Sequence, residues 1–368
     1  MISLEELNKK ILLEYIDSGE YAKSSVVPIS PHRALSQVHN LECDENDVIL
    51  LLAKKDSKLV GYVGVLPQFL YSESGERKKI GWLSALWVDP QERGQGIAGK
   101  LLKQAMKVWD EKLLSADYVP ATKIIYDRSG YFNKTPFVKD GVRLYVKADF
   151  QTLLPPKKPI FHKMKWVLKQ ADFVANGIFN LTRKSSLSSV SKAVFSYPQK
   201  IDDEMGSFIE SHLTKSNFRR GKEDLNAILN YPWLVEKQAA EPIDHKYYFS
   251  SWAKSFENKI LRVQAEDGSL VAVLFFTMRN GSLKLPYLFF EGEISRIGEI
   301  VNYHILLWNA TMFTTFHPLL SKELLKQSTP GFFKKRMERK YLISNVLSQE
   351  FFEKSPTFQD GDGDCAFT

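Results

Sequence analysis

Residues 86–102, LWVDPQERGQGIAGKLL, constrain the fold of this chain more than any other stretch. An apolar run ends at Val88, and Asp89-Pro90 turns the chain away from a strand, because proline lacks the N–H that a strand ladder needs. Three glycines follow closely, and an amphipathic run begins directly after them. The pattern predicts a strand, a loop and a helix in immediate succession.

The loop and the start of this helix form a potential anion site. The first turn of a helix has N–H groups without intrahelical partners and carries a partial positive charge. Gly94 and Gly96 can adopt positive φ and let an anion approach the backbone, and Arg93 adds a permanent charge. A diphosphate suits such a place.

Two alternatives stand beside a diphosphate site of this kind. One is a tight strand-to-helix turn without a ligand. The other is a dinucleotide loop, because Gly94, Gly96 and Gly99 match G-x-G-x-x-G. The segment 89–93 separates the first glycine from the strand, however, and no acidic residue ends a partner strand about 20 positions further on.

The stretch as a whole closely resembles the acetyl-CoA motif of the GCN5-related N-acetyltransferases (GNAT). That motif reads Gln/Arg-x-x-Gly-x-Gly/Ala after an apolar strand that ends in Val-x-Pro. Here it is Arg93-x-x-Gly96-x-Ala98 after Val88-Asp89-Pro90, and the resemblance covers about residues 1–150. It implies acetyl-CoA as the co-substrate, and no metal ion.

The resemblance also implies which residues hold the coenzyme. The pantetheine arm would pair like an extra strand with the backbone of Leu86, Trp87 and Val88. The pyrophosphate would lie on the N–H groups of the loop and first helical turn, namely Arg93, Gly94, Gln95, Gly96, Ile97, Ala98 and Gly99.

Tyr126 is the candidate general acid. Members of the family often carry Asn-x-x-Ala-x-x-x-Tyr before Gly-Phe, and Tyr126 lies four residues before Gly130. Val119 and Thr122 replace the Asn and the Ala, so the Asn contact to CoA is not expected here. The alternative role for Tyr126 is core packing. A backbone N–H near Val88 would meet the oxyanion, as the resemblance implies.

The general base is not evident from the sequence. Asp89, Glu92 and Asp127 lie near the motif, but we expect each to be a solvated loop carboxylate. A chain of water molecules is the alternative route for the proton of the amine.

The segments around the motif predict a mixed α/β (α+β) sheet of the GNAT-like acyl-CoA N-acyltransferase fold. Residues 48–55, 59–71, 79–88, 122–127 and 142–148 are predicted strands, and residues 3–17 a predicted helix.

The chain is too long for a single core, and its two halves repeat each other weakly. Residues 56–65 resemble 267–276, and "SGYFNK" resembles "PGFFKK". We therefore expect a catalytic domain over 1–150, a linker with a helix over 151–197, a degenerate GNAT-like copy over 198–345 and a flexible acidic tail over 346–368. Aligned on Gly331, the second copy carries Gln327 at the position of Tyr126 and has no Gly-x-Gly, so we expect it to bind no CoA.

The linker segment KKPIFHKMKWVLKQ is basic and contains several large apolar residues. Two interpretations are open: an amphipathic helix packed on both domains, and a helix that lies on an anionic membrane surface. The first is our expectation, so no membrane partner is predicted.

Charge and cysteine content exclude some other classes. The net charge of +7 comes from dispersed basic residues, which argues against a nucleic-acid partner but suits anionic ligands. Cys43 and Cys365 form neither a disulfide framework nor a zinc spacing. The N-terminal residues lack the apolar core of a signal peptide, so we expect a cytoplasmic protein.

The predicted function is N-acetyltransfer, which moves an acetyl or short acyl group from CoA to a primary amine of a small molecule or protein. A non-catalytic acyl-CoA sensor or scaffold is the alternative.

Overall fold

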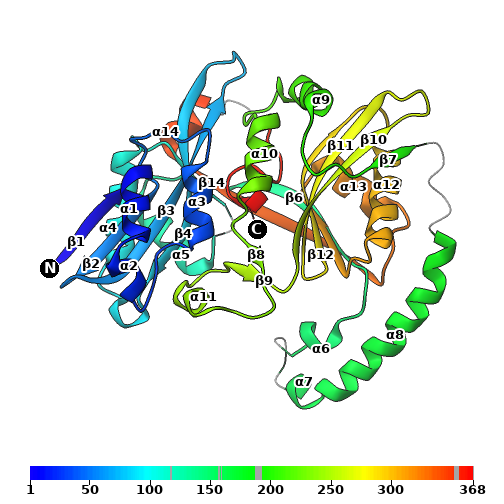
Figure 1. Ribbon diagram of the computed structural model, residues 1–368, viewed down its shortest axis with the longest axis horizontal. Helices are drawn as coiled ribbons and strands as arrows, with labels where there is room; N and C mark the ends of the chain where they lie inside the picture. Colours follow the sequence, from blue (N-terminus) through cyan, green and yellow to red (C-terminus); the bar gives the residue numbers. More distant parts are fainter. Residues whose placement is uncertain (117, 156–157, 159, 187–192, 352–355, 368) are drawn as a thin grey trace. The chain divides into compact units, whose positions relative to one another are not determined.

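The computed structural model describes residues 1–116, 118–155, 158, 160–186, 193–351 and 356–367, and the chain divides into two compact units (Figure 1). Unit 1 contains residues 1–138, 199–256 and 339–368, and unit 2 contains residues 139–198 and 257–338. Both units are mixed α/β structures, which confirms the predicted fold class. Neither unit is one continuous stretch of chain.

Unit 1 is built on the antiparallel strands β1 to β4, followed by β5, which is parallel to β4. Its elements in the first part of the chain are β1 (Ile2–Leu7), α1 (Lys9–Ile16), α2 (Gly19–Lys23), α3 (Pro31–Val38), β2 (Leu50–Lys55), β3 (Lys58–Tyr71), β4 (Arg77–Val88), α4 (Ile97–Val108), β5 (Leu113–Ala116) and α5 (Pro120–Ser129). Later segments add α9 (Asp203–Leu213), α10 (Lys222–Asn230), β8 (Val235–Glu236), α11 (Pro242–Lys246), β9 (Trp252–Ala253) and α14 (Asn345–Phe351).

Two predicted elements were wrong in type. Residues 2–7 form a strand whose partner is β2, with Ile2 opposite Lys55, and a helix starts only after Asn8, whose side chain accepts from the N–H of Ile11 at 3.0 Å. Pairing with a neighbouring strand overrides the local helical spacing here. Residues 122–127 lie in helix α5, which Pro120 starts and Gly130 ends.

The side chains of unit 1 form one core on each face of its sheet. Along β2, Leu51 and Ala53 join the core beneath α4, whereas Leu50 and Leu52 join the core with α1 and α3. This alternation follows the two-residue period of a strand. It anchors α4, and with it the glycine loop, on the sheet.

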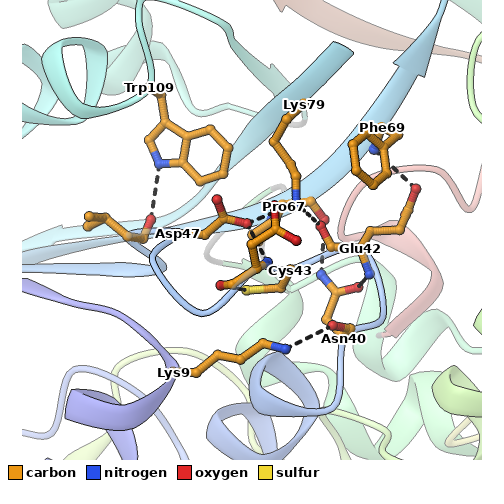
Figure 2. A network of polar contacts seen from close by, with 11 residues as sticks. Lys9, Asn40, Glu42, Cys43, Asp47, Pro67, Phe69, Lys79 and Trp109 are labelled. Carbon is orange, nitrogen blue, oxygen red and sulfur yellow. Dashed lines mark hydrogen bonds and ion pairs between the residues drawn. The ribbon is translucent and has the colours of Figure 1, made fainter. Parts of the chain in front are cut away.

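A network of hydrogen bonds fixes the loop between α3 and β2 in unit 1 (Figure 2). The ammonium of Lys79 on β4 donates to the carbonyl of Glu42 at 2.7 Å and contacts the carboxylate of Asp47 at 3.1 Å. The side chain of Asn40 donates to the carbonyl of Pro67 on β3 at 2.9 Å. The loop is therefore held against the two strands that lead to the glycine motif.

Unit 2 repeats the order of elements found in unit 1. Strands β10, β11 and β12 precede helix α12, strand β13 pairs in parallel with β12, and helix α13 follows. The elements of unit 2 are α6 (Phe150–Leu153), α7 (Ile160–Lys163), α8 (Lys165–Ser186), β7 (Val194–Ser196), β10 (Phe256–Gln264), β11 (Leu270–Arg279), β12 (Ser282–Phe290), α12 (Ile294–Leu307), β13 (Met312–Thr315) and α13 (Pro318–Lys326). Residues 187–192 of the expected linker lie outside the described residues.

The last strand of each unit comes from the other half of the chain. In unit 1, Tyr341–Ile343 of β14 (Phe333–Ile343) pair antiparallel with β5. In unit 2, Val142–Tyr145 of β6 (Phe137–Tyr145) pair antiparallel with β13. Strand β14, which follows α13, thus pairs with β5 of unit 1, and strand β6, which follows α5, pairs with β13 of unit 2.

The acidic C-terminal segment is not the flexible tail that its composition predicts. Phe358, Asp362, Ala366 and Phe367 are buried in unit 1, with Asp362 only 1% exposed. The ring of Phe367 stacks on Trp233 with 4.7 Å between centroids. Burial of these side chains outweighs the repulsion among the aspartates, because each carboxylate has a partner of its own.

Candidate active site

The end of β4 carries the residues that were predicted to hold the pantetheine arm. Pairing of β4 with β5 stops at Leu83 and Ser115, whereas pairing with β3 continues to Val88. Beyond Leu83 the β5-facing edge of β4 therefore has no strand partner among the described residues. An extended ligand could add to this edge as a further strand.

A β-bulge lies in β4 just before the part of its edge that has no strand partner. Ala85 has φ of +56°, and the register with β3 shifts between Tyr62 and Gly64, opposite Ser84 and Trp87. Bulges of this kind bend a strand and redirect its side chains next to binding sites. Leu86, Trp87 and Val88 follow this bulge and lie beyond the last residue of β4 that pairs with β5.

Two ion pairs hold the loop after β4. Lys55 binds the carboxylate of Glu92 at 2.9 Å, and Lys58 binds that of Asp89 at 3.1 Å. The hydrogen bond from Lys55 lowers the pKa of Glu92, and the backbone N–H of Gln91 lowers the pKa of Asp89. Both groups therefore hold the loop in place as ionised carboxylates. The expectation that Asp89 and Glu92 are solvated loop carboxylates was wrong, because each is paired with a lysine.

Gly94 and Gly96 have the backbone conformation that the anion-site hypothesis requires. Their φ angles are +85° and +74°, and a Cβ atom at either position, or at Gly99, would meet nothing within 4 Å. The two positive φ angles favour glycine, whereas packing does not demand it at any of the three positions. The space in front of these glycines is open.

Helix α4 begins at Ile97 with free donors. Gly96 is its N-cap and supplies no side-chain cap, and the first helical bond runs from the N–H of Lys100 to the carbonyl of Gly96 at 3.0 Å. The N–H groups of Ile97, Ala98 and Gly99 are left for an anion at the positive end of the helix. The buried face of α4 keeps this end in place through Ile97, Leu101, Leu102, Ala105 and Met106.

Tyr126 lies on α5 and reaches the end of β5. Its side chain is 3% exposed, and Ser115 donates a hydrogen bond to its hydroxyl oxygen at 3.3 Å. Burial, opposed by the hydrogen bond from Ser115 and assisted by the charge of Asp364, raises the pKa of Tyr126 to about 12. Because the hydroxyl accepts from Ser115, its own proton remains available to another acceptor.

Asp364 was missed by the sequence reasoning, which named no base. Ser84, at the bulge of β4, donates to its carboxylate at 2.5 Å. Gln68 fixes the preceding residue, since its side-chain oxygen accepts from the N–H of Gly363 at 3.1 Å and from the indole of Trp82 at 2.8 Å. The terminal segment thus brings a carboxylate to the point where β4 and β5 diverge.

Gly363 shows that this placement depends on close packing. Its φ is +73°, and a Cβ atom there would lie 2.8 Å from the ring of Trp82. Arg220 donates to the carbonyl of Gly361 at 2.8 Å, and Arg339 pairs with Asp360. The sequence signal that could have revealed the burial is the presence of Phe358 and Phe367 on either side of the aspartates.

The corresponding place in unit 2 has different chemistry. Helix α12 follows β12 through the exposed residues Glu291 and Glu293, and Glu293 is its N-cap. Negative side chains there oppose a phosphate. Gln327 uses its amide to donate to Ser295 and Glu323, both at 2.9 Å, and its oxygen lies where a side chain at Gly298 would project.

Comparison with protein families gives a match within the first part of unit 1. Residues 17–118 match the model of the acetyltransferase (GNAT) family. The chain therefore contains a GNAT-family domain, which confirms the resemblance inferred from residues 86–102. The family consists of acyltransferases that use acyl-CoA. A search of curated protein sequences found no match to this chain.

Solved structures share the fold at low sequence identity. A probable N-acyltransferase from Enterococcus faecalis has a TM-score of 0.52 at 11% identity, over 95% of this chain and 74% of that one. N-myristoyltransferase from Saccharomyces cerevisiae, solved with bound myristoyl-CoA, has a TM-score of 0.51 at 11% identity, over 94% of this chain and 82% of that one. These similarities extend the GNAT-like fold beyond the family match to nearly the whole chain.

Membrane-crossing helices were sought separately. In the described part of the chain, no helix has both the length and the apolar character needed to cross a bilayer.

Proposed function

We propose that this protein is an N-acyltransferase that moves an acetyl or short acyl group from CoA to a primary amine. The observation that carries the proposal is the junction of two features in unit 1: the open edge of β4 and the free N–H groups at the start of α4. The first suits the pantetheine arm and the second the diphosphate, in the order in which CoA presents them.

Tyr126 would act as the general acid. In the reaction the amine nitrogen attacks the thioester carbonyl carbon, and the C–S bond then breaks to release CoA thiolate. The high pKa of Tyr126 keeps its phenol protonated at neutral pH, so it can donate a proton to the thiolate. A backbone N–H near Val88 would stabilise the oxyanion that forms in between.

Asp364 would accept the proton that the amine loses as the N–C bond forms. Its carboxylate accepts a hydrogen bond from Ser84 at the bulge, and its negative charge contributes to the raised pKa of Tyr126. The proposed base, Asp364, would thus contact β4 through Ser84, and the proposed acid, Tyr126, would contact β5 through Ser115, where the two strands diverge. The proton gained by Asp364 returns to Tyr126 through solvent, and both groups are then ready for another turnover.

Unit 2 would bind no coenzyme. The acidic start of α12 and the structural bonds of Gln327 both support this proposal. Isothermal titration with CoA should give one site per chain, and a second site of comparable affinity would contradict the assignment.

The decisive experiment is a panel of amines with acetyl-CoA, followed by release of free thiol. Amino sugars, aminoglycosides, amino acids, polyamines and lysine peptides cover the acceptor classes. Thiol release above the rate of hydrolysis for at least one class supports the proposal. The rival function is a non-catalytic acyl-CoA sensor. The burial of Tyr126 is the observation that favours it. CoA binding without turnover on any amine would support this rival.

A further inference from the structure

Helices α7 and α8 of unit 2 expose an unusual amount of apolar surface. Trp166 is 72% exposed, Phe173 77% and Val174 59%. Exposed apolar residues of the same segment are Ile160, Met164, Trp166, Val167, Phe173 and Val174. We call this set the apolar face. It lies on the segment for which we expected an amphipathic helix packed on both domains.

The opposite face of α8 is committed to the chain itself. Leu168 and Asp172 are buried, and the carboxylate of Asp172 accepts from the N–H groups of Phe150 and Gln151 at 2.6 and 3.1 Å. Asn176, one turn further on, bonds the N–H and the carbonyl of residue 148 at 2.8 and 2.9 Å. Residues 168, 172 and 176 thus fix the rotation of α8, and the apolar face is not the side that packs.

The charge around the apolar face has one sign. Lys158, Lys163, Lys165 and Lys169 are all exposed. Asp172 is the only acidic residue between positions 150 and 186, and it is buried. No ion pair is found for these lysines among the residues that the structure describes. The exposed surface of the segment therefore combines apolar and aromatic side chains with uncompensated positive charge.

We propose that the apolar face of α7–α8 binds the surface of an anionic phospholipid bilayer. A helix with lysines beside an apolar stripe lies in the interface plane, where its apolar side enters the boundary of the acyl chains. Each lysine near an anionic surface strengthens binding by electrostatic attraction. The exposed indole of Trp166 suits the headgroup level, where tryptophan is enriched. An apolar protein groove would explain the apolar face but not the absence of any exposed carboxylate.

The test is sedimentation of the full chain with vesicles. The protein should bind vesicles of phosphatidylglycerol mixed with phosphatidylcholine, bind pure phosphatidylcholine far less, and dissociate as salt rises. The double variant W166E/F173E should lower partition by about tenfold or more. Leu319→Glu on α13, where the leucine is 55% exposed, makes a similar change elsewhere in unit 2 and should bind normally. Circular dichroism checks that each variant is folded.

A second measurement places the helix in the bilayer. Brominated lipids should quench the fluorescence of the wild-type chain, and Trp166→Phe should remove most of that quenching while the other tryptophans remain. Absence of binding to anionic vesicles would overturn the proposal, as would an equal loss in L319E. Self-association that protects Trp166 from soluble quenchers without lipid would also overturn it, because the face would then bind a second copy. None of these outcomes depends on acyltransferase activity.

Discussion

The side chains of Ser84 and Asp364 meet at 2.5 Å although 280 positions separate them in the chain. One belongs to the bulged strand of the GNAT domain, and the other to the terminal segment that was expected to be flexible. Their contact brings a carboxylate into the proposed active site, and most of the proposed chemistry depends on it.

Replacing Asp364 by Asn should lower kcat by about 100-fold, because general-base catalysis contributes about 10² to 10⁴. The amide can still accept from Ser84, so the fold and CoA affinity should be preserved. Steady-state kinetics and calorimetry check both points. D110N, which changes an exposed aspartate of unit 1, is the matched control. A D364N enzyme with unchanged kcat would remove Asp364 from the mechanism.

Tyr126→Phe should lower kcat by about 100-fold or more while the Kd for CoA stays within about twofold. It removes only the proton and a weak bond from Ser115, so the stability loss should be about 1 kcal/mol. Y118F removes a hydroxyl from the tyrosine whose ring lies 6.2 Å away, and it should turn over normally. Equal losses in both variants would indicate a packing role for Tyr126.

Gly99→Val tests whether a ligand approaches the start of α4. The position has no positive φ, and an added Cβ meets nothing within 4 Å, so the fold should be unaffected. CoA affinity should nevertheless fall by about tenfold or more, because the side chain occupies the space of the diphosphate.

Gly96→Val adds backbone strain at the same site. The control is G75V, since Gly75 has φ of +87° and equally open surroundings. Calorimetry should show weaker CoA binding in G99V and G96V but not in G75V. Unaltered binding in G99V and G96V would exclude this loop as the phosphate site.

Glu42 makes the stability of unit 1 depend on pH. Burial raises the pKa of its carboxyl from 4.5 to about 8, against the opposing effect of Arg220. The folded state therefore holds a proton that the unfolded state releases, and this contribution is complete below pH 4.5 and lost as pH rises to about 8.

The variant E42Q removes this dependence while its amide oxygen can still accept from the N–H of Phe69. Its free energy of unfolding relative to wild type should rise by about 1 kcal/mol or more between pH 5 and pH 9. Urea unfolding at both pH values measures this change, and the exposed E76Q serves as the control. A pH-independent difference would contradict the assignment.

The parts of the site that arise from local sequence were predictable. The strand that ends at Val88, the loop glycines and helix α4 form one continuous stretch, so turn chemistry and periodicity determine them together. Tyr126 was assigned through its spacing to Gly130, although the helix that carries it was expected to be a strand. A short apolar run such as residues 122–127 has no period long enough to separate the two.

The parts that arise from distant contacts were not predictable. Residues 2–7 form a strand because β2 lies beside them, and their own pattern favours a helix. The pairing of β14 with β5 and of β6 with β13 could not be predicted, because the local sequence of a strand does not say which distant strand it pairs with. Asp364 was missed for the same reason, since its position depends on the hydrogen bond from Ser84 and on the close packing of Gly363 against Trp82. The chain limits of the two expected copies stay a prediction.

The strand exchange affects how the protein is made on the ribosome. Unit 1 needs the end of β14 and the terminal segment, which emerge after all of unit 2 has been synthesised. A nascent chain therefore presents β5 as a bare sheet edge and Trp82 without its cover, both of which invite aggregation. Pairing of β5 with β14 has to wait until both β14 and the terminal segment have been synthesised, so premature termination anywhere before β14 yields a protein that lacks both the strand partner of β5 and Asp364.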